Sequence, residues 1–357
     1  MLITTGLTLF LVRRSTSRQV KAHEYFAGGL ADSSHRTYNS AQRQFLQFCR
    51  EFSFDPLPAS EDTLILFTTH LAQRIKPQLI TVYLAAVRSL QVAHGLSNPL
   101  QPGLKLKQTL RGIDRQHFSA PKQKLPLTFD ILSAVKPFLN PRSDDDNVKW
   151  AALTTGHFLM LRAGEITVAS SDHFDSSIHL TFSDAKLRTS ADGSEYLSLQ
   201  IKQSKTDQRR QGVTLYTAHS NHFVCAVCAM KTNLALHHRR GTVNKTTTPL
   251  FQLSDSSPLT KNALVSLVSQ LLRLIGLDLS QYNGYSLRIG GATSASIAGL
   301  SDYEIKLLGR WNSDCYQRYI RSPLNLFLGI PRKIAQTQTI KFQYANPYIL
   351  NKDSSEH

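Results

Sequence analysis

Five short stretches in the second half of the chain carry residue types that suit chemistry on a phosphate ester. They are Met160-Leu-Arg162-Ala-Gly-Glu165-Ile, Ser204-Lys205-Thr-Asp-Gln-Arg-Arg210, Tyr285-Ser-Leu-Arg288-Ile-Gly-Gly-Ala-Thr293, Leu307-Leu-Gly-Arg-Trp311 and Tyr316-Gln-Arg-Tyr319-Ile-Arg321. A guanidinium can hold two phosphate oxygens at once and stays charged at any working pH, so Arg162 and Arg288 are candidate phosphate ligands. A tyrosine hydroxyl can attack phosphorus once it is oriented in line, and Tyr316 and Tyr319 are both candidates.

Taken singly, these residues also fit ordinary structural roles. An Arg-x-x-Glu pair is most often a surface ion pair of little consequence. Lys205 would fit a solvated turn, and Tyr285 and Trp311 would fit a core or a helix cap. The order and spacing of the whole set favour one shared site instead.

In this order the five stretches resemble the tyrosine recombinases, which include the phage integrases and the Xer-type and Cre-type enzymes. The pattern of that family is Arg, Lys, His-x-x-Arg, His or Trp, and then Tyr, and the resemblance covers about residues 30–330. It implies that Arg162 and Arg288 hold a DNA phosphate while Tyr319 attacks it to form a 3′-phosphotyrosyl link. Tyr319 precedes Ile-Arg as the family nucleophile does, which favours it over Tyr316.

The resemblance also implies a proton donor and a reaction that needs no cofactor. Lys205, in the turn between two predicted strands, is placed to protonate the leaving 5′-oxygen. The covalent link preserves the energy of the phosphodiester, so we expect neither ATP nor a metal. Rejoining to another 5′-hydroxyl then gives strand exchange.

Two positions depart from the residues that the family uses most often. Tyr285 stands where His-x-x-Arg has its histidine, and a tyrosine, with a reference pKa of about 10, is a poor proton shuttle at neutral pH. Trp311 stands at the later His or Trp position, as in the Cre-type enzymes, and its indole N–H donates but does not titrate. The motif Leu-Gly-Arg-Trp-x-Ser-Asp, followed by Tyr-Ile-Arg, most resembles the sequences of recombinases from eukaryotic mobile elements of the DIRS and Crypton types.

The elements that must position these residues change character along the chain. The first part has helical periodicity, with Tyr38, Ala41, Phe45 and Phe48 on one face. The helices predicted there are 35–50, 60–71, 78–95 and 104–115. Further along we expect helices at 129–138, 149–162, 224–238, 261–276, 288–299 and 303–308, an acidic loop at 143–147, and antiparallel strands at 178–182, 195–201 and 212–216.

A domain boundary is marked by two prolines that bracket two lysines within 119–128, because proline stiffens a connector and forbids a helix through it. We therefore divide the chain into an uncertain N-terminal segment (1–29), a helical core-binding domain (30–117), a linker (118–127), a catalytic domain (128–332) and a C-terminal tail (333–357). The predicted fold class is an all-α N-terminal domain plus an α+β catalytic domain, mostly helical with a small antiparallel sheet. The resemblance implies that the two domains form a C-shaped DNA clamp.

The charge balance points to a polyanionic partner. The chain has 41 Lys and Arg against 25 Asp and Glu, a formal charge of +16 and a pI near 9.8. Candidate contacts to DNA phosphates in the first domain are Arg36, Arg43, Lys76, Arg88, Lys105, Lys107 and Arg111. The resemblance implies double-stranded DNA and a homo-oligomer, a dimer on one site and a tetramer in synapsis. The apolar segment 324–330 resembles the family segment that docks on a neighbouring protomer, although a plain core helix would also fit.

The cysteines and the N-terminus indicate the compartment. The cysteine count, 4 in 357 residues, does not make a disulfide framework, which indicates a reducing environment. His222, Cys225, Cys228, His237 and His238 look like the start of a zinc site, but the histidine pair falls on an amphipathic helix, so we expect no metal. The apolar run at 1–12 is too short to cross a bilayer and precedes two arginines, the reverse of a signal peptide. We expect a nuclear protein in a eukaryote or otherwise a cytoplasmic one, not secreted and without a membrane partner.

Two other functions fit parts of the same evidence. A type IB topoisomerase would share the chemistry and relax supercoils as a monomer, but the separate helical domain argues against it. A catalytically silent, domesticated DNA-binding protein would account for Tyr285.

Overall fold

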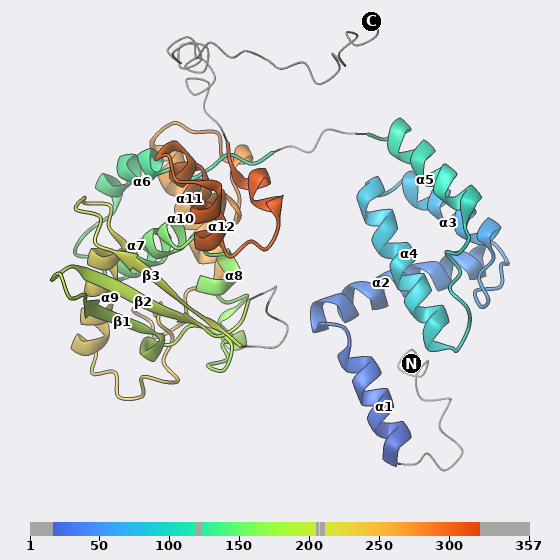
Figure 1. Ribbon diagram of the computed structural model, residues 1–357, viewed down its shortest axis with the longest axis horizontal. Coiled ribbons are helices and arrows are strands. Elements are labelled where there is room, and N and C mark those ends of the chain that lie inside the picture. Colours follow the sequence, from blue (N-terminus) through green and yellow to red (C-terminus); the bar gives the residue numbers. More distant parts are fainter. Residues whose placement is uncertain (1–16, 119–122, 205–206, 208–210, 322–357) are drawn as a thin grey trace, which may run out of the picture. The chain divides into compact units, whose positions relative to one another are not determined.

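The computed structural model describes residues 17–118, 123–204, 207 and 211–321, which form the coloured ribbon of Figure 1. The chain divides into two compact units, Met1–Pro121 and Lys122–His357. Lys205, the apolar segment 324–330 and the tail 333–357 lie outside the described residues. Each unit is built on a hydrophobic core of its own.

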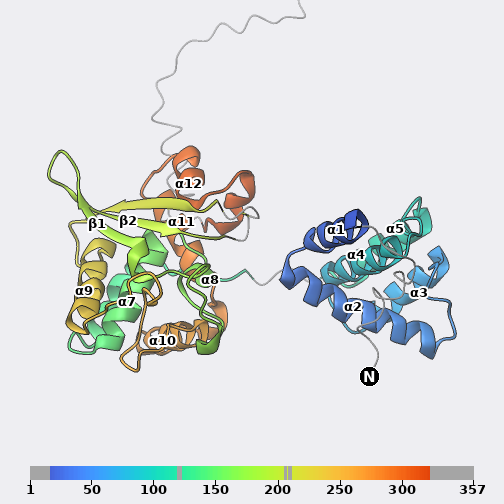
Figure 2. The ribbon, with the colours of Figure 1, turned by 90° about the horizontal axis from the view of Figure 1, so that it is seen from below.

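The first unit is entirely helical within its described residues. Its helices are α1 (Ser17–Gly28), α2 (Asp32–Glu51), α3 (Glu61–Ala72), α4 (Pro77–Ala93) and α5 (Leu104–Gln116). The apolar face predicted for 35–50 is the buried face of α2, where Phe45 and Phe48 pack against Phe67 of α3. Ser60 caps α3 by accepting the N–H of Thr63 at 3.0 Å, as its sequence predicts. Figure 2 shows α2 to α5 as one group of packed helices.

The second unit wraps shorter elements around a buried helix. Its helices are α6 (Phe129–Val135), η1 (Lys136–Phe138), α7 (Asp144–Phe158), α8 (Ala163–Ile166), η2 (Ser171–His173), η3 (Phe182–Asp184), α9 (Ala226–Arg239), α10 (Lys261–Leu274), η4 (Leu279–Gln281), α11 (Ser286–Ile297), α12 (Asp302–Gly309) and η5 (Asp314–Tyr319). Helix α7 is central, since α9, α11 and α8 all pack against it. Its residues from Trp150 to His157 are buried throughout.

The sheet has three antiparallel strands in the order β1 (Ala185–Thr189), β2 (Glu195–Ile201) and β3 (Val213–Ala218). The prediction of a first strand at 178–182 was wrong, because this strand begins only at Ala185. Asp184 accepts the N–H and the hydroxyl of Thr181, both at 2.7 Å, and this cap closes a 3₁₀ turn at 182–184. The alternating pattern that suggested a strand reflects the burial of Leu180 and Phe182, and the pairing of this segment is an isolated antiparallel bridge between Thr181 and Pro249.

The acidic loop predicted at 143–147 was also wrong, because it forms the first turn of α7. Ser143 is the N-cap and accepts the N–H of Asp146 at 3.2 Å. Asp144, Asp145 and Asp146 occupy the first turn, where the helix dipole favours negative charge. In addition, Asp144 accepts from Arg239 and Arg240, which ties the start of α7 to the end of α9.

The predicted fold class is confirmed: an all-α first unit and a mostly helical second unit with a small antiparallel sheet. The C shape of the clamp concerns the placement of the two units and stays a prediction. Among the described helices, none combines the length and the apolar character that a membrane span requires.

Candidate functional site

Two arginines from distant parts of the second unit share one carboxylate. Arg162 donates to Glu165 from Nη1 to Oε1 at 2.9 Å and from its main-chain N–H to Oε2 at 2.9 Å. Arg310 reaches the same carboxylate with Nη2–Oε2 at 2.7 Å and Nη1–Oε1 at 3.3 Å. The Glu165 side chain is only 5% exposed, whereas those of Arg162 and Arg310 are 21% and 14% exposed. The carboxylate therefore lies beneath two guanidiniums that still reach the surface.

A third arginine lies deeper. Arg288 is fully buried on α11, and its two terminal nitrogens donate to the main-chain oxygens of Met160 and Gly309. These oxygens lie just before Arg162 and Arg310 in the chain, so Arg288 ties the two segments together. Its Nε has no hydrogen-bond partner among the described residues. The three guanidiniums thus belong to one cluster, in which main-chain oxygens hold Arg288 and the Glu165 carboxylate holds Arg162 and Arg310.

The Gly-Gly pair after Arg288 explains how a helix carrying a buried arginine fits here. A Cβ at Gly290 would lie 1.8 Å from the main-chain oxygen of Leu127, and one at Gly291 would lie 2.3 Å from that of His157. Neither backbone can yield by that amount, so only glycine lets α11 approach both α7, at His157, and the segment before α6, at Leu127, so closely. This approach brings Arg288 to the end of α7 and next to the carbonyl of Met160.

Trp311 and Tyr319 form the aromatic wall of the cluster. The Trp311 ring centroid lies 4.4 Å from the Arg288 guanidinium carbon and 5.1 Å from the Tyr319 ring, and Tyr319 lies 5.6 Å from the same carbon. A Cβ at Gly309 would lie 1.7 Å from the indole, so this glycine gives the ring its space over the end of α12. Thr293 of α11 anchors the last segment, because its hydroxyl donates to the Tyr319 carbonyl at 3.2 Å and accepts from the Arg321 N–H at 3.1 Å.

The two tyrosines of the fifth stretch occupy different environments. Tyr316 is 1% exposed, and its hydroxyl hydrogen-bonds Asp302, which together with burial raises the pKa of Tyr316. Tyr319 is only partly buried and ends η5 beside Arg288. Tyr319 is therefore the tyrosine that the cluster places beside its guanidiniums, and Tyr316 is a core residue.

The charge of the cluster is unbalanced. Burial alone would raise the pKa of Glu165, but hydrogen bonds and charges from Arg310 and Arg162 outweigh it and lower that pKa, so the residue stays ionised. Burial, followed by the charges of Arg162 and Arg310, lowers the pKa of Arg288 to about 10, which still leaves it protonated at neutral pH. Three positive charges thus face one negative charge. A site with this excess attracts an anion with several oxygens, such as a phosphate.

Arg310 is the member of the cluster that was not predicted. It stood inside the fourth stretch, next to Trp311, but only the tryptophan was chosen there. Its backbone is in the left-handed region, with φ of +58°, where a side chain other than glycine is disfavoured. A signal was present in the sequence, since an arginine directly after glycine at a helix end is an unusual cap.

The other predicted catalytic residues, Tyr285 and Lys205, are not part of the contacts described above. Tyr285 is the N-cap of α11 and is 58% exposed, and among the described residues the hydrogen bonds and ion pairs of the three arginines go to other groups. Lys205 lies outside the described residues. Lys202, at the end of β2, offers no substitute, because its ammonium lies 2.7 Å from Asp184 and 2.7 Å from the Ser176 carbonyl.

The basic residues predicted to contact DNA are all exposed on the first unit. They lie on α2, at the start of α4 and along it, and on α5, and they comprise Arg36, Arg43, Lys76, Arg88, Lys105, Lys107 and Arg111. Exposure leaves their charges available to a partner but does not identify one.

Comparisons with known proteins give one curated relative and several solved structures. No family model matches the chain. An integrase/recombinase XerD homolog of Selenomonas ruminantium is 23% identical over 282 residues, which is 78% of this chain and 77% of the relative. The structure of the Tn1549 transposon integrase with transposon right end DNA has a TM-score of 0.53 at 12% identity and covers 89% of this chain and 98% of that one. The lambda integrase dimer bound to a core site has a TM-score of 0.53 at 14% identity, covering 85% and 94%. These likenesses show that the chain has the fold of the integrases.

Proposed function

We propose that this chain, whose relatives support the tyrosine recombinase and integrase family, is a site-specific recombinase that cuts and rejoins DNA through a 3′-phosphotyrosyl intermediate. One observation carries the proposal: Arg162 and Arg310 share the Glu165 carboxylate, and Arg288, which ties their two segments together, lies against the ring of Tyr319. A DNA phosphodiester supplies the anion that this excess of positive charge attracts. Tyr319 supplies a nucleophile at the same place.

The chemistry assigns a role to each part. Arg162 and Arg310, which reach the surface, bind the non-bridging oxygens, on which charge builds as phosphorus is attacked. This differs from the pair Arg162 and Arg288 that the resemblance implies, because both terminal nitrogens of Arg288 donate to main-chain oxygens. The buried Arg288 adds a third positive charge and holds in place the two segments that carry Arg162 and Arg310. The Tyr319 oxygen bonds to phosphorus and gives its proton to water, the bond to the 5′-oxygen breaks, and Lys205 protonates that oxygen. The covalent link conserves the phosphodiester for the rejoining step.

The narrower parts of the proposal rest on the resemblance of the motifs. We place the chain with recombinases of eukaryotic mobile elements of the DIRS and Crypton types, acting in the nucleus. Its protomers would bind one site as a dimer and pair two sites as a tetramer, with the two units closing on the duplex as a clamp. Size measurement of the protein on one and on two DNA sites tests this assembly.

Covalent trapping tests the activity directly. Sequences that the full chain binds are first selected from a random pool of duplex DNA, and the selected site is then synthesised with a nick near the cleavage position. Cleavage of this substrate releases a short strand that diffuses away, so the phosphotyrosyl complex accumulates and survives denaturing electrophoresis. Failure to form any adduct on a verified site would overturn the proposed activity.

DNA binding is expected to weaken steeply with salt. If about six phosphates are contacted, affinity should fall by roughly 1000-fold between about 50 and 200 mM salt, because each contact releases counterions. Replacing Lys105 and Lys107 on α5 by alanine should reduce the slope of log K against log salt by about 2. Lys231→Ala serves as a control, since this exposed lysine of α9 is paired with Glu195 at 3.0 Å. An equal slope in the parent and the double variant would show that these two lysines of α5 do not contact DNA phosphates.

Tyr285→His is expected to maintain or raise the rate of adduct formation. The side chain is 58% exposed, so the exchange should leave the melting temperature nearly unchanged. Histidine titrates near neutral pH and can move protons there, whereas tyrosine cannot. The rate on the nicked substrate measures the effect. If the parent forms no adduct and the histidine variant does, the chain is the silent DNA-binding protein rather than an active recombinase.

A further inference from the structure

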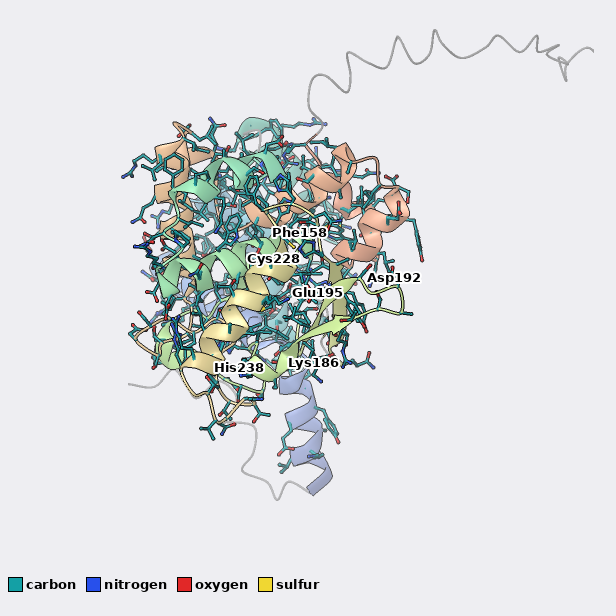
Figure 3. All side chains as sticks on the ribbon, turned by 90° about the vertical axis from the view of Figure 1, so that its left-hand side faces the viewer. Phe158, Lys186, Asp192, Glu195, Cys228 and His238 are labelled. Atoms are coloured by element: carbon teal, nitrogen blue, oxygen red, sulfur yellow. The ribbon has the colours of Figure 1, made fainter. Side chains whose placement is uncertain are left out.

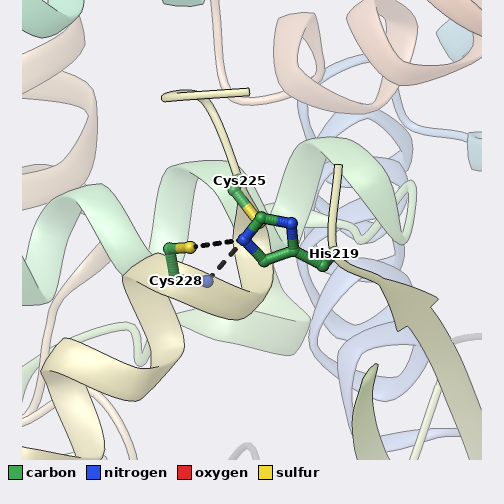
Figure 4. Close-up of side chains that lie close together, drawn as sticks. All are labelled: His219, Cys225 and Cys228. Atoms are coloured by element: carbon green, nitrogen blue, oxygen red, sulfur yellow. Dashed lines mark hydrogen bonds between the residues drawn. The ribbon is translucent and has the colours of Figure 1, made fainter. Parts of the chain in front are cut away.

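Three metal-ligating side chains meet at the turn between the sheet and α9, in a part of the second unit that the proposed reaction does not use. They are His219, directly after β3, Cys225, the N-cap of α9, and Cys228, in the first turn of that helix. Their ligand atoms all lie within 4.8 Å of one another, and Nε2 of His219 lies 3.0 Å from Sγ of Cys228 (Figure 4). The two cysteines are free thiols.

This set differs from the zinc pattern considered in the sequence. His237 is buried and its Nε2 lies 2.8 Å from the Leu250 carbonyl, so it belongs to the core. Figure 3 shows His238 at the opposite end of α9 from Cys228. His222 packs its ring on Phe223 and accepts the Val224 N–H at its Nδ1. The histidine that joins the cysteines is His219, whose distance from them along the chain does not follow a common zinc spacing.

The groups around the cluster support ligation rather than simple packing. Sγ of Cys225 accepts the N–H groups of Ser220 and Cys228, both at 3.5 Å, an arrangement that stabilises a thiolate. Nδ1 of His219 accepts the main-chain N–H of Asn221 at 3.0 Å and lies 2.9 Å from Oδ1 of the same residue, which holds the ring with Nε2 toward the sulfurs. Metal-binding histidines are oriented by such a partner on the other nitrogen.

The ligand types select the metal. Two thiolates and one imidazole are soft to intermediate donors, which favour Zn²⁺ over Mg²⁺ or Ca²⁺. Cys225 is buried and Cys228 is exposed, so solvent can reach the cluster and a water molecule could supply a fourth ligand. We propose that His219, Cys225 and Cys228 bind one zinc ion that fastens the end of β3 to the start of α9. The ion is structural and takes no part in strand cleavage.

Metal analysis of the full chain, expressed with zinc and freed of loose metal by gel filtration, tests this proposal. We expect about one zinc per chain, and Co²⁺ in its place should give a thiolate-to-cobalt charge-transfer band in the near ultraviolet. Cys228→Ser and His219→Ala should each weaken zinc binding by more than about 100-fold, since loss of a partner outside the ligand set already costs about 10–100-fold. Asn221→Ala, which removes such a partner, should fall within that smaller range.

Matched controls separate ligation from general damage. Cys315→Ser and His238→Ala replace exposed residues of the same two types elsewhere in the unit and should retain the zinc and the cobalt band. If Cys228→Ser fails to fold, Cys228→His supplies another donor and should keep both the fold and the metal. A parent protein without zinc, a Cys228→Ser variant that binds zinc as the parent does, or a disulfide between Cys225 and Cys228 in the purified protein would each overturn the proposal.

Discussion

The Tyr319→Phe variant is expected to bind the selected DNA site as tightly as the parent chain and to form no covalent adduct. Removing the hydroxyl deletes the atom that bonds to phosphorus, and the rate should fall by at least about 1000-fold, the order seen when a nucleophile is removed. The ring remains, so its contact with Trp311 at 5.1 Å and its place beside Arg288 survive. Binding by gel shift and adduct formation on the nicked substrate measure the two quantities separately.

Tyr316→Phe is the matched control for this experiment. The same atom is removed three residues earlier, from a ring that is 1% exposed and whose hydroxyl hydrogen-bonds Asp302. Loss of that hydrogen bond should lower the melting temperature slightly while the adduct still forms. An adduct that persists in Tyr319→Phe and disappears in Tyr316→Phe would show that the nucleophile is the buried tyrosine.

The helical part of the fold was accessible to sequence reasoning because its signals are local. The apolar face of α2 and the Ser60 cap of α3 both depend on residues within one or two turns. The first strand was misplaced because a buried segment with a single β-bridge gives the same alternation as a strand. Leu180 and Phe182 are buried on either side of Thr181, but the hydrogen bonds of Thr181 go to Asp184 and close a turn.

Site residues that belong to a short motif with a fixed spacing could be predicted from the sequence. Site residues that only the fold brings together were missed. Arg310 joins the cluster through Glu165, 145 positions earlier in the chain, and no local pattern gives that pairing. His219 reaches Cys228 across the turn that leads into α9. The sequence pattern instead grouped the cysteines with the histidine pair at the end of that helix. In both cases the missed partner is set by a tertiary contact, and a short motif records only one side of such a contact.

The buried Arg288 and the partly exposed Arg162 should respond differently to replacement by lysine. Arg288→Lys is expected to lower both stability and cleavage. A lysine has one ammonium and cannot donate in the fixed fork that Arg288 uses toward the Met160 and Gly309 carbonyls. Leaving one of these buried oxygens unpaired costs about 1–3 kcal/mol in the free energy of unfolding. The segments that carry Arg162 and Arg310 then lose their common anchor.

Arg162→Lys should instead leave the stability nearly unchanged and lower the rate of cleavage. Glu165 keeps both hydrogen bonds from Arg310, so the free energy of unfolding should change by less than about 1 kcal/mol. Cleavage should fall by about 100-fold, because a lysine cannot hold two phosphate oxygens as the partly exposed guanidinium does. Urea unfolding measures the stability of the two variants, and adduct formation on the nicked substrate measures their cleavage. Equal loss of stability in both would mean that Arg162 serves the fold, and its role on the phosphate would then have to pass to Arg310.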